Sequence, residues 1–310
     1  MKRIVTLTVN PAVDMSCAVD QVFAEHKLRC GPGTYEAGGG GLNVSRAIRK
    51  LGGESAAIYL AGGLIGQVLG SLLEAEAIEH RRIAIEGVTR ENFTVLEESS
   101  GQQYRFVLPG PAVSEAEWTH CLDAVRDLDP APDFLVASGS LPPDVPDDFY
   151  ARLARVAEAR GMRMVLDTSG SALREALRGK VFLVKPSLRE LRTWSGRELS
   201  DEAAQDAAAL QIVRDGVAEI VVVSLGAAGA LVASKDGCER LRSPTVPVKS
   251  KVGAGDSMVA GIVLGLDRGL APRDAICFGL AAGAACVMSA GTQLCGREDT
   301  ERLFRGMGSG

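Results

Sequence analysis

Hydrophobic residues occur in two kinds of segment that alternate along most of the chain. Short runs rich in β-branched and other apolar residues predict strands, several of them apolar throughout, as expected where both faces of a strand are covered. Between these runs, apolar positions recur at helical spacing. The predicted strands are residues 3–9, 55–60, 134–138, 162–167, 182–185, 219–224 and 229–233, and the predicted helices are residues 42–51, 147–160, 202–215, 256–268 and 272–289. The alternation predicts an α/β fold with a mostly parallel sheet and helices on both sides.

Two segments, residues 13–36 and 91–108, break this alternation because they are extended and partly polar without a helical period. Residues 92–97 and 102–107 are separated by Glu98-Ser99-Ser100-Gly101, which suits a hairpin loop. We therefore expect a small antiparallel sheet that forms a lid over one edge of the main sheet. Such a sheet usually needs a partner for its apolar face. A homodimer formed through the lid is expected, and the main domain is the alternative cover.

The composition of the chain mainly excludes certain kinds of partner. The 310 residues are 46% hydrophobic with a net charge of −5, and no lysine- or arginine-rich run occurs; nucleic-acid and membrane partners are therefore not expected. The amino-terminal residues read as a first strand, and no apolar stretch is long enough to span a bilayer. Seven scattered cysteines without a CxxC pair favour reduced thiols in a cytoplasmic protein. Because no linker or repeat occurs, residues 1–310 are expected to form one domain.

The segment Val252-Gly253-Ala254-Gly255-Asp256-Ser257 is the strongest candidate for chemistry. Its small residues stand directly before a predicted helix, where backbone N–H groups attract an anion. A carboxylate in the same turn, Asp256, can take a proton from an attacking hydroxyl, and the combination suits phosphoryl transfer. A structural alternative is about equally open: Asp256 or Ser257 could only cap the helix.

Two earlier segments could contact a substrate. Four consecutive glycines, Gly38 to Gly41, open into a predicted helix with Asn43 in its first turn. Their backbone could approach a ligand closely, and the Asn43 amide offers donors and acceptors to hydroxyl groups. Asp14 follows the first strand, and open α/β sheets bind ligands beyond the ends of their strands. Tight turns are the alternative explanation for both segments.

Two later strands end in residues that suit a nucleotide. Lys185 ends one predicted strand and could approach ATP phosphates, while Glu190 on the next helix could orient water around Mg²⁺. Another strand enters a glycine-rich turn at Ser224-Leu225-Gly226, which could border the nucleotide. Neither segment is specific by itself.

Four basic residues, Lys27, Arg29, Arg90 and Arg105, cluster around the predicted lid. A substrate phosphate would need such charges, and the arginine fork suits phosphate oxygens. Solvated surface cations are the alternative, so two or three of the four are expected to be ligands. The chain lacks the GxxxxGK[ST] loop, a GxGxxG turn between strand and helix, HExxH and GxSxG, which argues against the enzyme classes built on these motifs.

Taken in order, these motifs resemble the PfkB (ribokinase-like) family of carbohydrate kinases, from Leu7-Thr8-Val9-Asn10-Pro11 to the region of Gly291-Thr292. Residues 252–258 are similar to the family's C-terminal signature, and residues 38–43 to its N-terminal signature. Residues 27–30, 38–44, 103–107 and 138–143 are most similar to the family's ATP-dependent 6-phosphofructokinases. The resemblance implies a ribokinase-like three-layer αβα sandwich with a small β-sheet lid. It also implies transfer of the ATP γ-phosphate to the 1-hydroxyl of fructose 6-phosphate.

The resemblance further implies a role for each matching position. Asp256 would deprotonate the sugar hydroxyl, and the backbone of Gly253, Ala254 and Gly255 would form the anion hole. The implied sugar ligands are Asp14, Gly39, Gly40, Asn43, Ser138 and Gly139, and the implied ligands of the 6-phosphate are Arg90, Arg105 and Lys27, the last from a partner's lid. The implied ATP site comprises Lys185, Ser187, Ser224, Gly226 and Gly229, with Glu190 near Mg²⁺. Carbonyl groups near Ser250, Val252 and Gly291 would hold a monovalent cation such as K⁺.

One position departs from the family pattern, because Ser187 stands where the family usually has asparagine. Serine can still bond phosphate or metal-bound water, but its reach is shorter, so the affinity for ATP or Mg²⁺ could differ. The departure also leaves a non-catalytic sugar-phosphate-binding module as a remote alternative. A 1-phosphofructokinase or a tagatose-6-phosphate kinase is a nearer alternative, although the four-glycine segment lacks the lysine that 1-phosphofructokinases tend to carry there.

Overall fold

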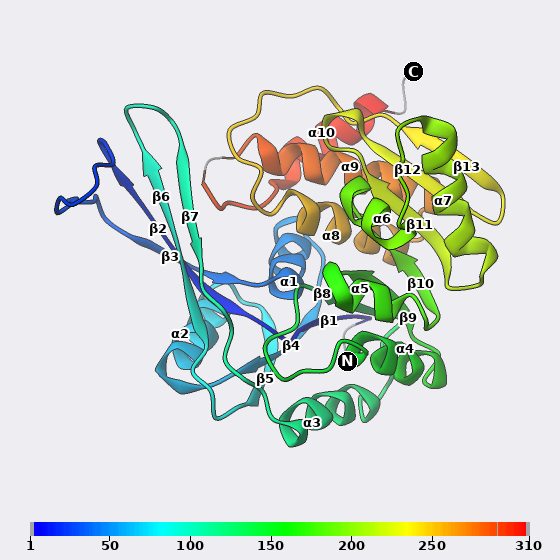
Figure 1. The fold of residues 1–310 in the computed structure, drawn as a ribbon, viewed down its shortest axis with the longest axis horizontal. Helices are drawn as coiled ribbons and strands as arrows, with labels where there is room; N and C mark the ends of the chain where they lie inside the picture. The colour runs from blue at the N-terminus through cyan, green and yellow to red at the C-terminus, as the bar shows by residue number, and fades with distance from the viewer. Residues whose placement is uncertain (1–2, 290, 308–310) are drawn as a thin grey trace.

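A large sheet crosses the molecule, and a second, smaller sheet stands at one side of it (Figure 1). The computed structural model describes residues 3–289 and 291–307. The large sheet contains, from edge to edge, β13 (Gly237–Leu241), β12 (Ala230–Ser234), β11 (Ala218–Ser224), β10 (Val181–Val184), β9 (Arg163–Asp167), β8 (Phe134–Ser138), β1 (Ile4–Thr8), β4 (Ala56–Ala61) and β5 (Glu79–Ala84). All neighbours from β11 to β5 are parallel, and β12 and β13 add an antiparallel edge.

The seven predicted strands are confirmed, and the two strands that the pattern did not predict, β5 and β13, are the edges of the sheet. In β5 only Ile83 is buried, and in β13 only Leu241. Edge strands are solvated on one side, so neither has the apolar run that marks a covered strand.

The strands separate two hydrophobic cores. Along β8, Phe134 and Val136 belong to one core, whereas Leu135 and Ala137 belong to the other. Successive side chains of a strand point to opposite faces, so a strand that is buried throughout must be covered on both sides. This arrangement explains the continuous apolar runs of the inner strands.

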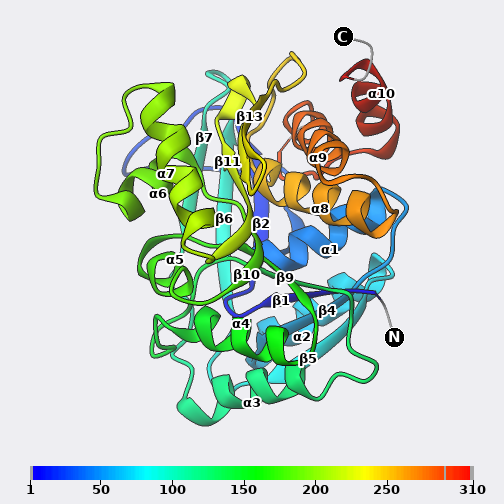
Figure 2. The same cartoon turned by 90° about the vertical axis from the view of Figure 1, so that its right-hand side faces the viewer.

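Two layers of helices provide that cover (Figure 2). One layer contains α1 (Gly40–Lys50), α2 (Gly63–Ala75), α8 (Ala254–Asp267), α9 (Pro272–Val287) and α10 (Arg297–Met307), and the other contains α3 (Glu115–Arg126), α4 (Phe149–Ala159), α5 (Gly170–Ala176), α6 (Leu188–Ser195) and α7 (Glu202–Arg214). The five predicted helices are confirmed as α1, α4, α7, α8 and α9. Within residues 3–289 and 291–307, no helix has both the length and the apolar character required to cross a membrane.

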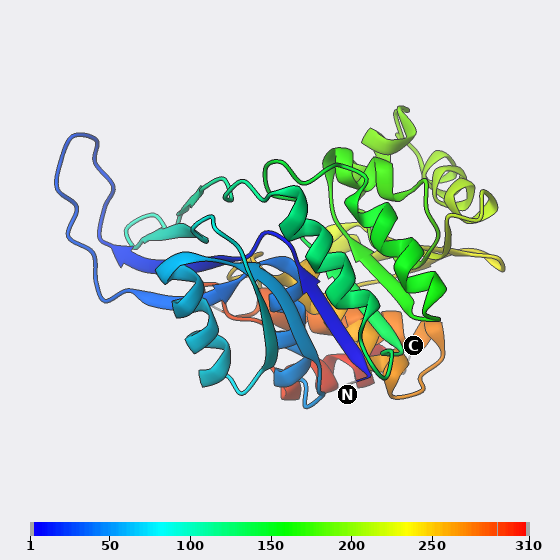
Figure 3. The ribbon, with the colours of Figure 1, turned by 90° about the horizontal axis from the view of Figure 1, so that it is seen from below.

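The lid consists of β2 (Ala12–Val19), β3 (Thr34–Gly38), β6 (Arg90–Glu97) and β7 (Gln103–Val107), in the order β3-β2-β6-β7. The predicted hairpin forms between β6 and β7, and β2 and β3 are also antiparallel. The middle pair, β2 and β6, is parallel, so the lid is a mixed sheet with two antiparallel hairpins. Since β2 follows β1 and β6 follows β5, both strands leave the same edge of the main sheet in the same direction. The loop between β2 and β3 extends away from the body (Figure 3).

Candidate active site

Helix α8 begins at the carboxyl edge of the main sheet, where most candidate residues converge. Its cap is Gly253, whose φ of 74° lies in the left-handed region, and no side chain caps the helix. Asp256 lies in the first turn and is therefore not the cap that the structural alternative required. The turn presents backbone donors and a carboxylate together, which is the combination expected for an anion site beside a base.

The Asp256 carboxylate lies in a group of polar side chains from other elements. Asn43 of α1 donates from Nδ2 to Asp256 Oδ2 at 2.9 Å, and Ser138 at the end of β8 is a further hydrogen-bond partner. Burial and the negative charge of Asp167 raise the pKa of Asp256 to about 7. The two hydrogen bonds and the charge of Lys185 oppose that rise. A carboxylate with a pKa near neutrality is suited to general base catalysis.

Lys185 and Asp167 form a buried ion pair beside this carboxylate. Lys185 Nζ lies 3.1 Å from Asp167 Oδ2, and Lys185 is only 6% exposed. Burial lowers the pKa of Lys185, but the charge and hydrogen bond of Asp167 outweigh it and raise the pKa overall. A Cβ atom on Gly255 would lie 3.6 Å from Lys185 Nζ, so the ammonium group stands against the glycine turn. Sequence reasoning missed Asp167, although its place at the carboxyl end of a predicted strand was a usable signal.

The glycines of the N-terminal segment lie where a side chain cannot fit. Gly39 has a φ of 116°, and a Cβ atom on Gly40 would lie 2.3 Å from Ser138 Oγ. Gly139 also has a positive φ, of 114°, and its carbonyl oxygen accepts a hydrogen bond from the Tyr150 hydroxyl at 2.9 Å. The start of α1 and the end of β8 therefore approach each other closely. This approach brings together Asn43 and Ser138, both of which are hydrogen-bond partners of Asp256.

The lid contributes a second polar group. Asn92 on β6 lies opposite Asp14 on β2 and donates from Nδ2 to Asp14 Oδ1 at 2.7 Å. Burial raises the pKa of Asp14, against the Asn92 hydrogen bond and the charges of Arg90 and Arg105. Three N–H groups of Arg90 reach backbone carbonyls of residues 10, 11 and 108. Since a guanidinium has five N–H donors, two of the Arg90 donors remain for a ligand.

Lys27 does not belong to this polar group around Asp14. It is exposed and belongs to the loop between β2 and β3, which forms the outer end of the lid (Figures 1 and 3). The chain therefore gathers Arg90 and Arg105 around Asp14 but leaves Lys27 on a projecting loop.

The predicted nucleotide residues meet where β10 and β11 end. Ser187 caps α6 in a capping box: its N–H donates to Glu190 Oε2 at 2.7 Å, and the Glu190 N–H donates to Ser187 Oγ at 3.3 Å. Ser187 also forms a parallel bridge with Ser224. Serine and asparagine cap helices about equally well, so the departure at this position preserves the local backbone.

A cavity of about 530 Å³ lies beside these residues and is lined in part by Ser187, Ser224 and Ala228. The backbone conformation of the turn that borders this cavity itself requires glycine. Gly226 has a φ of 62° and Gly229 a φ of 104°, and a Cβ atom on Gly229 would lie 2.0 Å from the Leu241 carbonyl oxygen. Backbone geometry therefore already accounts for the glycines of this turn.

Two of the residues predicted for a monovalent cation, Ser250 and Val252, directly precede α8. The Val252 N–H donates to Ser250 Oγ at 3.3 Å, and the Cys286 thiol donates to the Val252 carbonyl oxygen at 3.3 Å. Gly291 adopts a left-handed φ of 63°. Carbonyl and hydroxyl oxygens of this kind suit a hard cation.

Comparison with known proteins identifies the family of the chain. The family model described as pfkB family carbohydrate kinase matches residues 7–299. A relative named ATP-dependent 6-phosphofructokinase isozyme 2, from Mycobacterium tuberculosis, is 47% identical over 302 residues, which are 97% of this chain and 89% of the relative. The Escherichia coli protein of the same name is 42% identical over 305 residues, 98% of each chain.

The solved structure of Escherichia coli phosphofructokinase-2 in complex with potassium has a TM-score of 0.95 and 41% sequence identity, and the match covers 99% of this chain and 100% of that one. The expected ribokinase-like α/β fold is confirmed. By sequence and by structure, the chain belongs to the pfkB family of carbohydrate kinases.

Proposed function

We propose that this protein is an ATP-dependent 6-phosphofructokinase, which phosphorylates the 1-hydroxyl of fructose 6-phosphate and releases ADP. One observation carries the proposal: the carboxylate of Asp256, with a pKa raised to about 7, lies in the same turn as the backbone donors of an uncapped helix start. A base and an anion site within one turn are what transfer of a phosphoryl group to a hydroxyl requires. The names of the two full-length relatives support fructose 6-phosphate as the acceptor.

In this mechanism, Asp256 accepts the proton of the sugar 1-hydroxyl as that oxygen attacks the γ-phosphorus. Asn43 holds the carboxylate through its 2.9 Å hydrogen bond. The backbone N–H groups of residues 253–255 bind the charge that develops on the transferring group. Lys185 adds a positive charge beside them, and its ion pair with Asp167 keeps the ammonium in place.

ATP would occupy the edge of the sheet between the ends of β10 and β11, with Lys185, Ser187 and Ser224 nearest its phosphates. The glycine turn of Gly226 and Gly229 would border the rest of the nucleotide. Among residues 3–289 and 291–307, no three His, Cys, Asp or Glu residues are grouped to hold a metal ion. Mg²⁺ usually arrives with nucleotide phosphates and binds one or two carboxylates through water. Glu190 fits that role, because its capping bond from the Ser187 N–H uses Oε2 and not Oε1.

When bound, Mg²⁺ would neutralise charge on the β- and γ-phosphates. The monovalent site would be formed by carbonyl groups near Ser250, Val252 and Gly291, and K⁺ is the ion named in the complex of the Escherichia coli relative. Because Ser250 and Val252 lead into α8, the cation would stabilise the glycine turn. Replacing K⁺ by Na⁺ in the assay is expected to lower the rate, and equal rates would contradict the cation site.

Fructose 6-phosphate would lie between the lid and the body. Asp14 and Asn43 would bind its hydroxyl groups, together with the backbone of Gly39, Gly40 and Gly139 and with Ser138. Arg105 and the two remaining donors of Arg90 would bind the 6-phosphate. Lys27 would add a third cation only if a partner's loop brought it there.

A second copy of the chain fits the outer face of the lid. One row of side chains crosses all four strands and consists of Tyr35, Met15, Phe93 and Phe106. These side chains point away from the face that carries Asp14 and Asn92. Tyr35 is 53% exposed and Phe106 is 54% exposed. We infer a homodimer in which two such rows cover each other.

The dimer is tested by Phe106→Asp, which is expected to give monomers in sedimentation analysis. Lys27→Met is expected to raise the KM for the sugar phosphate while leaving the protein dimeric. A monomeric unmodified protein would contradict the dimer, and an unchanged KM would contradict the role of Lys27.

The function is tested by an ADP-release assay with MgATP and three acceptors: fructose 6-phosphate, fructose 1-phosphate and tagatose 6-phosphate. The highest kcat/KM is expected for fructose 6-phosphate. A preference for either other sugar would assign a different kinase of the family. Binding of ligands in calorimetry without ADP from any acceptor would identify a non-catalytic binding module.

A further inference from the structure

Arg46, on α1, is a buried cation in the layer behind the proposed base. It is 4% exposed and lies three residues after Asn43. Arg46 Nη1 donates to Asn43 Oδ1 at 3.4 Å, while Asn43 Nδ2 donates to Asp256 Oδ2 at 2.9 Å. Arginine has donors only, so it can face the amide oxygen of Asn43 but cannot accept from the amide nitrogen. Its position therefore determines which end of the amide faces the carboxylate.

The guanidinium is itself held on three sides. Arg46 Nε lies 2.7 Å from Glu76 Oε1 after the end of α2, and Nη2 lies 2.9 Å from Glu36 Oε1 on β3. Nη1 also donates to the Ala37 carbonyl oxygen at 2.7 Å. Charge-assisted bonds of this kind are strong, and in a buried site they fix one geometry.

Glu36 connects this group to the lid and to the segment before α10. It lies opposite Asp14 in the β2–β3 pairing. The Thr292 hydroxyl donates to the second oxygen of Glu36. A path of direct contacts therefore runs from lid strand β3 through Arg46 to Asn43 and Asp256.

We propose that Arg46 is a positioning residue that orients the Asn43 amide toward the base and couples that orientation to lid strand β3. The proposal rests on the proposed function, because it assigns Arg46 to the support of Asp256. Without Arg46, the amide could rotate and present its oxygen to the carboxylate. Asp256 would then lose a hydrogen bond that favours its charged form.

The consequence can be measured as a pH shift. Asp167 on β9, Lys185 on β10 and Cys286 on α9 also face Asp256 and remain in the variant. Arg46→Met removes the charge of Arg46 as well, whereas Asn43→Ala keeps that charge, so a similar shift in Asn43→Ala assigns the effect to the amide. The loss of the Asn43 bond raises the pKa of Asp256, since that bond lowers it in the intact protein. The acid limb of kcat/KM should therefore move to higher pH.

The test compares Arg46→Met with Arg49→Met, a matched control on the same helix that lines the same cavity of about 460 Å³. Arg46→Met is expected to lower kcat/KM about 10- to 100-fold and to shift the acid limb of the kcat/KM profile to higher pH. Arg49→Met is expected to change neither. In Arg46→Ala, the space left by the side chain opens into that cavity. Millimolar guanidinium should therefore restore the acid limb of the kcat/KM profile to its original pH, whereas ammonium should not.

A double-mutant cycle with Asn43→Ala gives a second readout. The losses should not add, because either change already removes the oriented amide. If Arg46→Met does not fold, Glu36→Gln and Glu76→Gln each weaken one anchor and should shift the limb by a smaller amount in the same direction. A folded Arg46→Met protein with an unshifted limb, or additive losses in the cycle, would overturn the positioning role. Absence of turnover in the unmodified protein would remove the proposed function and this role together.

Discussion

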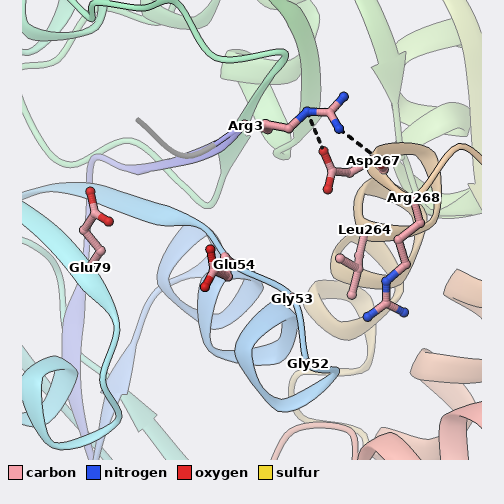
Figure 4. A pocket seen from close by; sticks show the side chains of 8 residues that line it. All are labelled: Arg3, Gly52, Gly53, Glu54, Glu79, Leu264, Asp267 and Arg268. Carbon is pink, nitrogen blue, oxygen red and sulfur yellow. Dashed lines mark hydrogen bonds and ion pairs between the residues drawn. The ribbon is translucent and has the colours of Figure 1, made fainter.

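Helix α8 carries an aspartate near each end, and the two differ in almost every physical respect. Asp256 lies in the first turn, at the carboxyl edge of the sheet, where burial and Asp167 raise its pKa to about 7. Asp267 is the last residue, at the amino edge, and lies 3.3 Å from Arg3 Nε in an ion pair whose arginine side chain is 62% exposed. Figure 4 shows Asp267 facing Arg3. Both residues line a cavity of about 560 Å³.

The difference shows that a cavity with charged walls does not by itself mark a site. The amino-edge cavity is also lined by Glu54, Glu79 and Arg268, so it offers mixed charge in solvent. The end of a helix carries a partial negative charge and its start a partial positive charge. ATP and a sugar phosphate, the proposed substrates, are both anions, and the start of α8 would attract them whereas its end would not.

The sharpest test of this comparison exchanges each aspartate for asparagine. Asp256→Asn is expected to lower kcat about 10²- to 10⁴-fold or more, with a modest change in KM, because a general base contributes a factor of that size. Asp267→Asn should keep near-normal turnover. Steady-state kinetics on fructose 6-phosphate measure both, and equal losses in the two variants would refute the assignment of the base.

Removing the cation beside the base should have the next largest effect. Lys185→Met is expected to lower kcat about 10²-fold, the usual cost of losing one electrostatic contact to the transition state. Lys185→Met should also move the acid limb of the kcat/KM profile to higher pH, since the charge of Lys185 lowers the pKa of Asp256. Lys180→Met is the control, because Lys180 pairs with Glu158 at the surface, with a side chain that is 60% exposed. Full activity of Lys185→Met would show that the buried ion pair is structural.

The rate itself should depend on pH through Asp256. Its proton must be absent for catalysis, so kcat/KM should rise about tenfold per unit below pH 7 and level off above about 7. Asp267→Asn should leave this profile in place, because Asp267 lies at the other end of the helix. A rate that is constant from pH 5.5 to 8 would contradict the raised pKa.

Stability should give the smallest contrast. The pKa of Asp256 is higher in the folded chain than in the unfolded chain, so the folded state binds more protons between about pH 4 and 7 and stability falls as pH rises through that range. Asp256→Asn removes this penalty and should raise the free energy of unfolding at pH 8 by a few kcal/mol relative to its effect at pH 4. Asp267→Asn should change it by about 0–1 kcal/mol, because the arginine of its ion pair is 62% exposed. Urea denaturation at both pH values measures the difference.

Much of the fold could be predicted from the pattern alone, because covered strands and amphipathic helices require particular residue spacings. The seven inner and near-inner strands, the five helices α1, α4, α7, α8 and α9, and the β6–β7 hairpin follow from that requirement. The edge strands β5 and β13 could not be predicted, since solvent on one side removes the need for an apolar run. The parallel β2–β6 pair also depends on where β1 and β5 end in space.

For the candidate site, the sequence by itself determined the turn of residues 253–256, because small residues directly before a helix permit the left-handed φ of Gly253 and a close backbone approach. Only the tertiary structure decided what surrounds that carboxylate. Asn43 lies 213 positions away along the chain, yet it donates directly to Asp256. Asp167 and Arg46 carry no motif of their own, and they matter because β9 and α1 place them beside or behind the base. Local spacing fixes the conformation of a turn, whereas desolvation and the direction of a hydrogen bond depend on contacts between segments distant in sequence.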